Sequence, residues 1–485
     1  MLSDLALRSP SAPGRPARAV EIGAALAAIL VACTIAAVAT RFDILLLAVA
    51  GCGGLLVFVL SLRWPVASLF VVAATIPFDE AVRFGDLGTV GRSAAILFAV
   101  SYALPRLGRL TLRAMPGPAW GYVAWAILSA GWALDQATAI QELGTLVQLF
   151  LLGLLVADLV IHRPTVVRPL LWVYTLSATV SALVGIAGYL GGQLNDGVRV
   201  AALPDQDPAQ YAAVLLPALV FSLYELIDGR WLLVSMSTAA ITMIGILLSG
   251  TRGAWLAVAV VGVLFILPHL RRRRRVAAAG ALAGIVVVAA LIPGVVDFVG
   301  ERAGTAISTG GSGRTDIWTV GLAIVASEPV TGVGYANFPV AFTPQIVRET
   351  ALADDTGVNR APHNVILSNL AELGPIGLAL MLLFIVPLLV RPGWGPDATV
   401  IQACLVALAT SAMFLDILDN RKQVWLLLGI AAGLQYLARA RDGTIDRPTS
   451  WPLFARLRRL AHRERSGPPA PAEPVPRPEA APGPA

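Results

Sequence analysis

Three side chains in this sequence have the types and surroundings needed for proton transfer and anion binding: His363, Arg252 and Arg314. A neutral imidazole can accept a proton from a hydroxyl group near neutral pH, so His363, between Pro362 and Asn364, is a candidate general base. The guanidinium group stays charged and can bind phosphate oxygens in pairs, which makes the two arginines candidate phosphate ligands. The alternatives are a surface histidine that caps a helix and arginines that anchor the chain at an interface.

The context of each arginine is compatible with an anion site, although for Arg252 alone a simple interfacial anchor is the slightly favoured interpretation. Arg252 lies in Leu248-Ser-Gly-Thr-Arg-Gly-Ala-Trp, where one apolar segment ends and the next begins almost at once. Arg314 follows Gly313 and precedes a segment that places four small or apolar residues on one helical face, before Pro329 ends the helix: Ile317, Val320, Gly321 and Ile324. An arginine at a helix N-terminus adds its charge to unpaired backbone N–H groups. The following Thr331-Gly-Val-Gly turn could approach a substrate closely, although ordinary loop glycines are the default interpretation.

A second pattern, Asp205-Gln-Asp207, could hold a divalent cation, but two carboxylates without a third ligand are weak evidence. We therefore expect no metal and no cofactor. The sequence has no HExxH motif, Walker loop or GxSxG elbow, which argues against a metalloprotease, an NTPase and a lipase.

The composition places these residues in a membrane protein. Of the 485 residues, 57% are hydrophobic and 14% are charged, and the mean hydropathy is +0.75. A soluble fold could not keep so much apolar surface out of water, so we expect an all-α polytopic membrane protein. Cys33, Cys52 and Cys404 fall in apolar segments without metal-ligand spacing and are expected to be buried.

The apolar segments predict about fourteen transmembrane helices, with twelve to fourteen as the range. They lie at residues 20–40, 43–62, 64–79, 91–106, 118–134, 138–161, 166–190, 208–227, 231–250, 253–269, 275–293, 374–390, 398–416 and 423–439. The expected organisation is a disordered cytoplasmic tail at 1–18, eleven helices in 19–293, a long extracytoplasmic loop at 294–363 that carries amphipathic helices, three helices in 364–439 and a basic, then Pro/Ala-rich tail at 440–485.

The distribution of basic residues predicts the orientation. The run Arg271–Arg275 lies between two apolar segments, so the positive-inside rule accounts for it better than a nucleic-acid groove does. With both termini in the cytoplasm, most arginines fall inside, as do His162, His269 and His462. His363, Arg252 and Arg314 then face outside. Near-helical alternation of apolar and basic residues at 451–463 fits a helix on anionic lipid or a solvated charged helix equally well.

Together these segments resemble the O-antigen ligase and polymerase superfamily of bacterial membrane glycosyltransferases. The resemblance covers about residues 195–390 and is carried by Leu248-Ser-Gly-Thr-Arg-Gly-Ala-Trp, by Gly313-Arg-Thr-Asp-Ile-Trp with Pro329-Val-Thr-Gly-Val-Gly-Tyr-Ala-Asn-Phe, and by Pro362-His-Asn-Val-Ile-Leu with Glu372-Leu-Gly-Pro-Ile-Gly. A weaker block is Arg199-Val-Ala-Ala-Leu with Asp207-Pro-Ala-Gln-Tyr-Ala, which departs from the family pattern at Ala202 and Asp207.

The resemblance implies a fold of the GT-C type and a metal-independent, inverting transfer of a glycan from a polyprenyl-diphosphate carrier. It implies that Arg252, Arg314 and Arg199 hold the diphosphate, that His363 deprotonates the acceptor hydroxyl, and that Asn364 and Gly313 support the site. The implied partners are the lipid-linked glycan, membrane lipid and an acceptor glycan, lipid or protein, without nucleic acid. The implied location is the bacterial cytoplasmic membrane.

Two other function classes remain open. One is a solute transporter, for example of bicarbonate, which would be expected to show broken helices in matching halves and charges near mid-membrane. The other is a membrane scaffold without activity, which gives no role to the long outer loop. Polymerase and ligase share the motifs, so the sequence leaves the acceptor open.

Overall fold

The computed structural model describes residues 61, 64–79, 89–195, 199–203, 206–269, 314–350, 360–391, 393–415 and 421–444. Within these ranges the chain is helical, and one isolated bridge pairs Asn195 with Arg199. The helices are α3 (Pro65–Thr75), α4 (Val90–Ala103), α5 (Gly117–Ser129), α6 (Gln136–His162), α7 (Val167–Leu190), α8 (Pro208–Asp228), α9 (Leu232–Leu248), α10 (Arg252–Val261), α11 (Leu267–His269), α14 (Arg314–Ser327), α15 (Phe338–Ala341), α16 (Pro344–Glu349), α17 (Val365–Val390), α18 (Ala398–Ala412) and α19 (Lys422–Arg441).

The helices agree with an all-α membrane protein. Among the described residues, four stretches are long and apolar enough to cross a membrane: Gln136–His162, Pro164–Leu190, Pro208–Asp228 and Val365–Val390. Four more apolar helical stretches are shorter: Pro65–Phe78, Leu232–Leu248, Arg252–Ile266 and Ala398–Ala412. The predicted spans at 20–40 and 275–293, and nearly all of the span at 43–62, lie outside the described residues, as do the N-terminal tail at 1–18 and residues 445–485 of the C-terminal tail. The count of about fourteen therefore stays a prediction.

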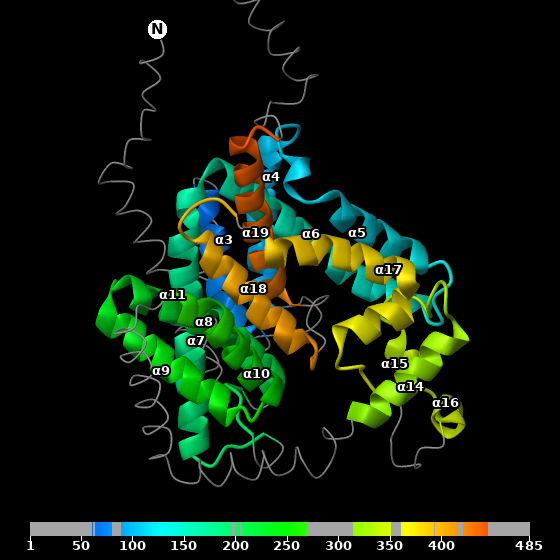
Figure 1. Cartoon of the computed structure of the whole chain (residues 1–485). Coiled ribbons are helices and arrows are strands. Elements are labelled where there is room, and N and C mark those ends of the chain that lie inside the picture. The colour runs from blue at the N-terminus through cyan, green and yellow to red at the C-terminus, as the bar shows by residue number, and fades with distance from the viewer. Residues whose placement is uncertain are drawn as a thin grey trace, which may run out of the picture.

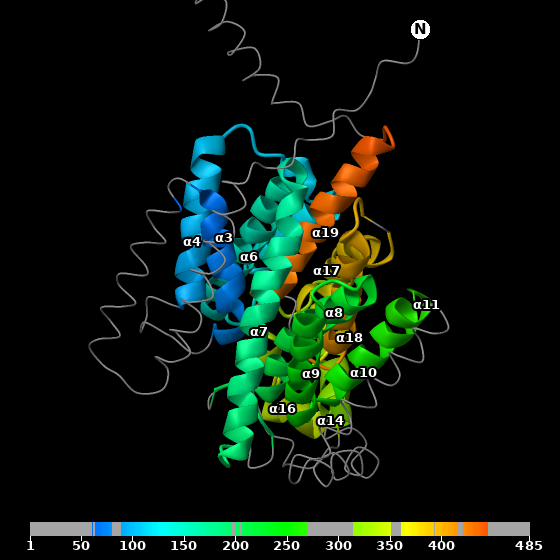
Figure 2. The ribbon, with the colours of Figure 1, turned by 90° about the vertical axis from the view of Figure 1, so that its left-hand side faces the viewer.

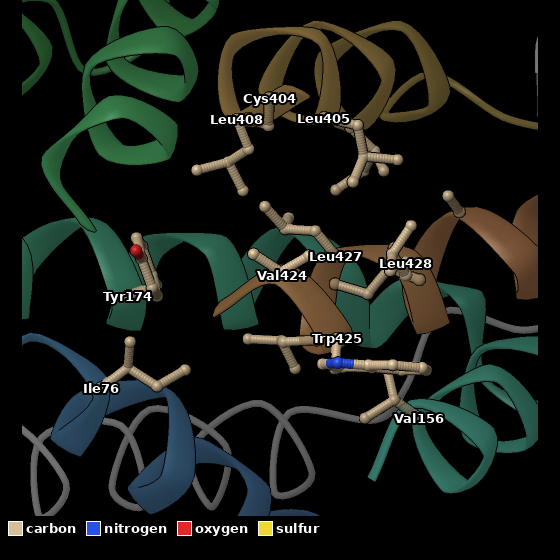
Figure 3. Packing of buried hydrophobic residues seen from close by; sticks show 14 of the residues in the cluster. Ile76, Val156, Tyr174, Cys404, Leu405, Leu408, Val424, Trp425, Leu427 and Leu428 are labelled. Atoms are coloured by element: carbon tan, nitrogen blue, oxygen red, sulfur yellow. The ribbon is translucent and has the colours of Figure 1, made fainter. Parts of the chain in front are cut away.

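The hydrophobic core is built around α19, which is flanked by α6 and α18. Gly153 of α6 and Gly429 of α19 lie so close that a Cβ on Gly429 would be 2.4 Å from the Gly153 carbonyl oxygen. Small residues at such a crossing let two helix backbones approach, as in other membrane helix pairs. Figure 3 shows Trp425 of α19 beside Val156 of α6, and Leu405 and Leu408 of α18 on the other side of α19. The buried Cys404 of α18 belongs to this core, as predicted.

The opposite side of the core is formed by α3, α4 and α7. Figure 2 shows α3 and α4 side by side, with α7 next to α3. The Ser177 hydroxyl of α7 donates a 2.5 Å hydrogen bond to the Ala74 carbonyl of α3. Such side-chain bonds between helices add directional contacts where apolar packing alone has no preferred register.

A cluster of charged residues joins the end of α8 to α7 and α18. Arg168 of α7 forms an ion pair with Glu225, a second pair with Asp397 at 3.2 Å, and a third with Asp228 at 3.6 Å. The Glu225 side chain is only 2% exposed. A buried carboxylate is stable only when a cation and hydrogen bonds replace its water, so Arg168 stabilises the contact between these helices.

The helix α17 is broken at Gly374, where φ is 67° and ψ is −172°. This is where the sequence-based span begins, whereas the helix itself begins at Val365. Pro375 has no N–H to donate to the Ala371 carbonyl, so a regular helix cannot continue through this point. The carbonyl groups freed by the break accept hydrogen bonds from other elements. The Val333 and Gly334 N–H groups donate to the Ala371 and Glu372 carbonyls, respectively. The Trp125 indole N–H donates to the Leu373 carbonyl.

The predicted outer loop packs on the first half of α17. Figure 1 shows α14, α15 and α16 together below α17, apart from α7 to α10. The buried face of α14 consists of the four residues that the periodicity predicted: Ile317, Val320, Gly321 and Ile324. They join Phe338 and Phe342 in a small core against Leu367 and Ala371 of α17. The loop is thereby fixed to the helix that begins just after His363.

Candidate functional site

Arg252 is the first residue of α10 and follows a three-residue turn after α9. Gly250 has a φ of 60°, which glycine adopts without strain. The Thr251 hydroxyl donates to the Pro208 carbonyl at 3.3 Å, and the Thr251 N–H donates to the Ser249 hydroxyl at 3.2 Å. The turn is therefore fixed to the start of α8, and it holds the half-buried Arg252 at the positive end of a helix.

Arg314, at the start of the described part of α14, is held next to His363. Trp318 lies one helical turn further along α14, and its indole N–H donates to the Pro362 carbonyl at 3.2 Å. Residues four apart lie on the same face of a helix, so this bond brings Arg314 to the segment that carries His363. The Arg314 charge is accordingly one of the groups that lower the pKa of His363.

Phe414, just after α18, lies between the two arginine-bearing helices. The Arg314 guanidinium carbon is 5.8 Å from the centroid of the Phe414 ring, within cation–π range. On α10, a Cβ at Gly253 would be 3.0 Å from the Phe414 Cβ. One aromatic side chain thus contacts Arg314 and the residue next to Arg252, which places both arginines in one region of the molecule.

His363 has an unusual backbone and a lowered pKa. Its φ of 49° lies in the left-handed region, which costs a residue other than glycine about 1–3 kcal/mol. Burial is the largest cause of the lowered pKa, followed by the positive charge of Arg314; Arg360 acts in the same direction, and Asp207 acts against them. The imidazole is therefore neutral at pH 7, the form that can accept a proton.

Two of the polar residues singled out from the sequence cap helices. The Asn364 side chain accepts hydrogen bonds from the Ile366 and Leu367 N–H groups, each at 3.0 Å, and so caps α17. The Asp207 side chain accepts from the Ala209 and Gln210 N–H groups at 2.6 and 3.1 Å and caps α8. Asx residues at this position satisfy backbone donors that the helix cannot. Asp205 and Gly313 lie outside the described residues.

Arg199 lies near the turn that carries Arg252. Its backbone pairs with Asn195 through bonds of 2.6 and 2.9 Å, and the next residue, Val200, donates to the Leu248 carbonyl at 3.2 Å. Leu248 is the last residue of α9, so the half-buried Arg199 lies beside the end of that helix. The structure thus brings Arg199 and Arg252 to one end of α9, and Arg314 and His363 to the neighbouring side of Phe414.

The glycines of the Thr331-Gly-Val-Gly turn contact protein backbone closely. A Cβ on Gly332 would lie 2.4 Å from the Glu372 carbonyl carbon, and one on Gly334 would lie 2.5 Å from the Ala133 Cα. Both glycines have positive φ angles, 68° and 96°. Their role in this structure is to let the loop lie against the break in α17 and against the start of the α6 region.

Glu372 is a residue whose structural role the sequence motifs did not reveal. Its carboxylate accepts hydrogen bonds from the Ala336 N–H at 3.0 Å and the Phe338 N–H at 3.1 Å, and the side chain is buried. A carboxylate within an otherwise apolar helix costs free energy unless it has a partner or a function. The position of Glu372 in the apolar sequence of α17 was therefore the feature that could have indicated its role. No local sequence pattern indicated a role for Phe414. Its role comes from its contacts with Arg314 of α14 and Gly253 of α10, which are distant in the sequence.

These elements define a helical membrane protein in which cationic side chains surround a neutral histidine at a loop–helix junction. Residues 237–382 match the family model described as O-antigen ligase (Wzy_C). The matched stretch includes α10, α14, His363 and the break in α17. No curated protein matches the chain. The match over residues 237–382 supports the resemblance to the O-antigen ligase and polymerase superfamily, and with it a membrane glycan ligase or polymerase in general.

Proposed function

We propose that this protein transfers a glycan from a polyprenyl-diphosphate carrier to an acceptor hydroxyl on the outer side of the bacterial cytoplasmic membrane, during assembly of a surface polysaccharide. The observation that carries the proposal is the hydrogen bond between Trp318 and the Pro362 carbonyl. It holds a cation, Arg314, beside a histidine that is neutral at pH 7. A glycosyl transfer that starts from a diphosphate needs both of these groups close together.

In the proposed reaction, His363 acts as the general base. A hydroxyl of the acceptor attacks the anomeric carbon and gives its proton to the free nitrogen of the imidazole. A new glycosidic C–O bond forms as the bond from the anomeric carbon to the diphosphate oxygen breaks. Attack from the face opposite the leaving group inverts the configuration. The lowered pKa of His363 keeps the imidazole ready to accept this proton near neutral pH.

The arginines stabilise the departing diphosphate. The electron pair of the broken bond stays on the diphosphate oxygen, so negative charge grows there during the reaction. Arg314 and Arg252, with Arg199 at the edge of the site, can neutralise this charge where other glycosyltransferases use a metal ion. The N-terminus of α10 adds the partial positive charge of its backbone N–H groups. Asn364 supports His363 by fixing the start of α17.

The break in α17 is the observation that bears on the transporter alternative. Transporters use interrupted helices to expose carbonyl groups to an ion. Here the carbonyls of Ala371, Glu372 and Leu373 accept hydrogen bonds from Val333, Gly334 and Trp125, so the protein itself occupies them. The break serves to attach the loop, and this favours the transferase over the transporter.

The test is product analysis with purified protein and polyprenyl-diphosphate glycans. A longer lipid-linked glycan identifies a polymerase, and a glycan on a new acceptor identifies a ligase. Absence of any transfer, with substrates that a known ligase or polymerase accepts under the same conditions, would contradict the proposal. Undiminished transfer in excess EDTA would support the use of arginines in place of a metal, and loss of transfer in EDTA would overturn that part.

A further inference from the structure

A basic and apolar surface lies on the linker between α4 and α5, residues 104–113. Its sequence, Leu-Pro-Arg-Leu-Gly-Arg-Leu-Thr-Leu-Arg, contains four leucines and three arginines and no acidic residue. Figure 2 shows this linker at the end of the molecule opposite α14 and α16, and therefore away from Arg314 at the start of α14. The proposed glycan transfer gives the linker no role, so its composition needs another explanation.

The linker is fixed to the buried carboxylate of Asp158, near the end of α6. This carboxylate accepts hydrogen bonds from the Thr111 N–H at 2.7 Å and from the Tyr102 hydroxyl at 2.8 Å. Within the linker, the Arg109 N–H donates to the Arg106 carbonyl at 2.8 Å and closes a tight turn. These bonds give the linker a defined shape, so the side chains that it exposes are held in a fixed arrangement.

The side chains that the linker exposes are apolar and cationic. Leu104, Leu107 and Leu112 are 62%, 64% and 41% exposed. Arg109 and Arg113 are exposed as well. Among the described residues, the guanidinium groups of Arg109 and Arg113 have neither a hydrogen bond nor an ion pair. Each guanidinium group can therefore bind an anion from outside the protein, and phosphate oxygens suit its planar donors.

The position of the linker on α6 indicates what surrounds it. This helix is long and apolar enough to cross a membrane, and Asp158 lies about one turn before its last residue, His162. A loop that is bonded to the end of such a helix lies at the level of the lipid headgroups. At that level, leucine side chains contact acyl chains and arginine side chains contact lipid phosphates.

We propose that the linker 104–113 binds an anionic phospholipid, with the headgroup at Arg109 and Arg113 and the acyl chains against the exposed leucines. An acidic soluble protein or a nucleic acid would complement the charge, but it would leave the leucines in water. A neutral phospholipid would cover the leucines and leave the positive charge uncompensated. An anionic phospholipid satisfies both parts of the surface. This inference is independent of the proposed glycan transfer.

The test is native mass spectrometry of the full-length protein in a neutral detergent, with phosphatidylglycerol and phosphatidylcholine of the same acyl chains as separate probes. The wild type should retain phosphatidylglycerol more strongly. Arg109→Gln/Arg113→Gln should lower the affinity for phosphatidylglycerol about 25-fold, because each arginine near an anionic lipid contributes a similar free energy. Its affinity for phosphatidylcholine should be unchanged. The control Arg391→Gln/Arg441→Gln removes two exposed arginines at the ends of α17 and α19 and should keep the preference.

Two further measurements separate the lipid from other occupants of the surface. Glycerol 3-phosphate, which has the phosphate without acyl chains, should not displace phosphatidylglycerol, and Leu107→Gln should weaken the binding of both lipids. Equal displacement by glycerol 3-phosphate would identify a site for soluble phosphate and overturn the proposal. A wild-type dimer that becomes a monomer in Arg109→Gln/Arg113→Gln would identify a second copy of the chain as the occupant and would also overturn it.

The stability of the arginine variant provides the last check. Because the two guanidinium groups have no partner among the described residues, Arg109→Gln/Arg113→Gln should unfold at the same temperature as the wild type in detergent without lipid. A lower unfolding midpoint would show that these arginines stabilise the fold and would refute their assignment to a lipid. Equal retention of the two lipids by the wild type, or unchanged retention of phosphatidylglycerol by the variant, would refute it as well.

Discussion

Arginines from other elements lie near the two ends of α8, in opposite electrostatic surroundings. At the end of the helix, Arg168 meets three carboxylates, those of Glu225, Asp228 and Asp397. At its start, about 30 Å away by helix length, the charges that act on His363 are those of Arg314 and Arg360 against that of Asp207. The protein neutralises the first arginine with its own carboxylates, as a structural contact requires. Among the described charges that act on His363, two are positive and one is negative, an arrangement that a diphosphate would complement.

The strongest test of this difference is the removal of the base. His363→Ala should lower the rate of glycan transfer by about 100- to 10,000-fold, the usual contribution of a general base. The unfolding midpoint should stay within the range of the wild type. His162→Ala provides the control, because this half-exposed side chain bonds to the Asp158 carbonyl within α6. Full activity of purified His363→Ala would refute the base assignment.

A change at the other end of α8 should affect stability and leave catalysis unaffected. Arg168→Met leaves the buried Glu225 carboxylate without its cation, and we expect a loss of about 3–5 kcal/mol in the free energy of unfolding. Transfer per folded molecule should be unchanged. Arg314→Gln should show the reverse, with transfer lost and stability kept. Equal losses of stability in both variants would remove the distinction between a structural and a functional arginine.

A smaller effect is expected at Phe414, which contacts Arg314. Phe414→Leu keeps an apolar side chain against Gly253 but removes the ring, and with it a cation–π interaction of about 0.5–1 kcal/mol. The KM for the lipid-linked glycan should rise about two- to fivefold with kcat nearly unchanged. Phe414→Tyr retains the ring and should behave as the wild type. A fall in kcat with an unchanged KM would place Phe414 in a different role.

The smallest expected effect is a shift in pH dependence on changing Arg360. Burial and nearby cations lower the pKa of His363, so the neutral, active form persists below the ordinary histidine range. The value of kcat/KM should be flat at higher pH and should fall as the pH drops through this lowered pKa. Arg360→Gln removes one of the cations, so the acid limb should move to higher pH. An unchanged limb would show that Arg360 does not act on the base.

Much of the local structure could be predicted from the sequence. Apolar runs located α6, α7, α8 and α19 to within a few residues, and the periodicity of Ile317, Val320, Gly321 and Ile324 identified the buried face of α14. The tight turn before Arg252 was also predicted correctly. These features depend on residues close in sequence, so their patterns are visible without knowledge of the tertiary contacts.

The features that the sequence left open depend on partners far along the chain. The glycines at 332 and 334 could have served a substrate or an ordinary loop, and only the position of the Glu372 and Ala133 backbones explains them. Asp207 could have been a metal ligand, and its side chain caps α8. Phe414 lies in an apolar stretch like many others. Its contacts with α10 and α14 arise from packing that no local pattern encodes.

The break at Gly374 has a consequence for protein engineering. The first half of α17 carries the attachment for the loop, and this helix begins just after His363. The loop is therefore not a separable module. An exchange of acceptor specificity between related proteins by loop grafting would have to move the stretch from Arg314 to Leu373 as one piece. A crossover placed at Asn364 would combine the grafted loop with the first half of α17 from the recipient protein. The loop would then lose its matched hydrogen bonds to the carbonyl groups at the break in α17.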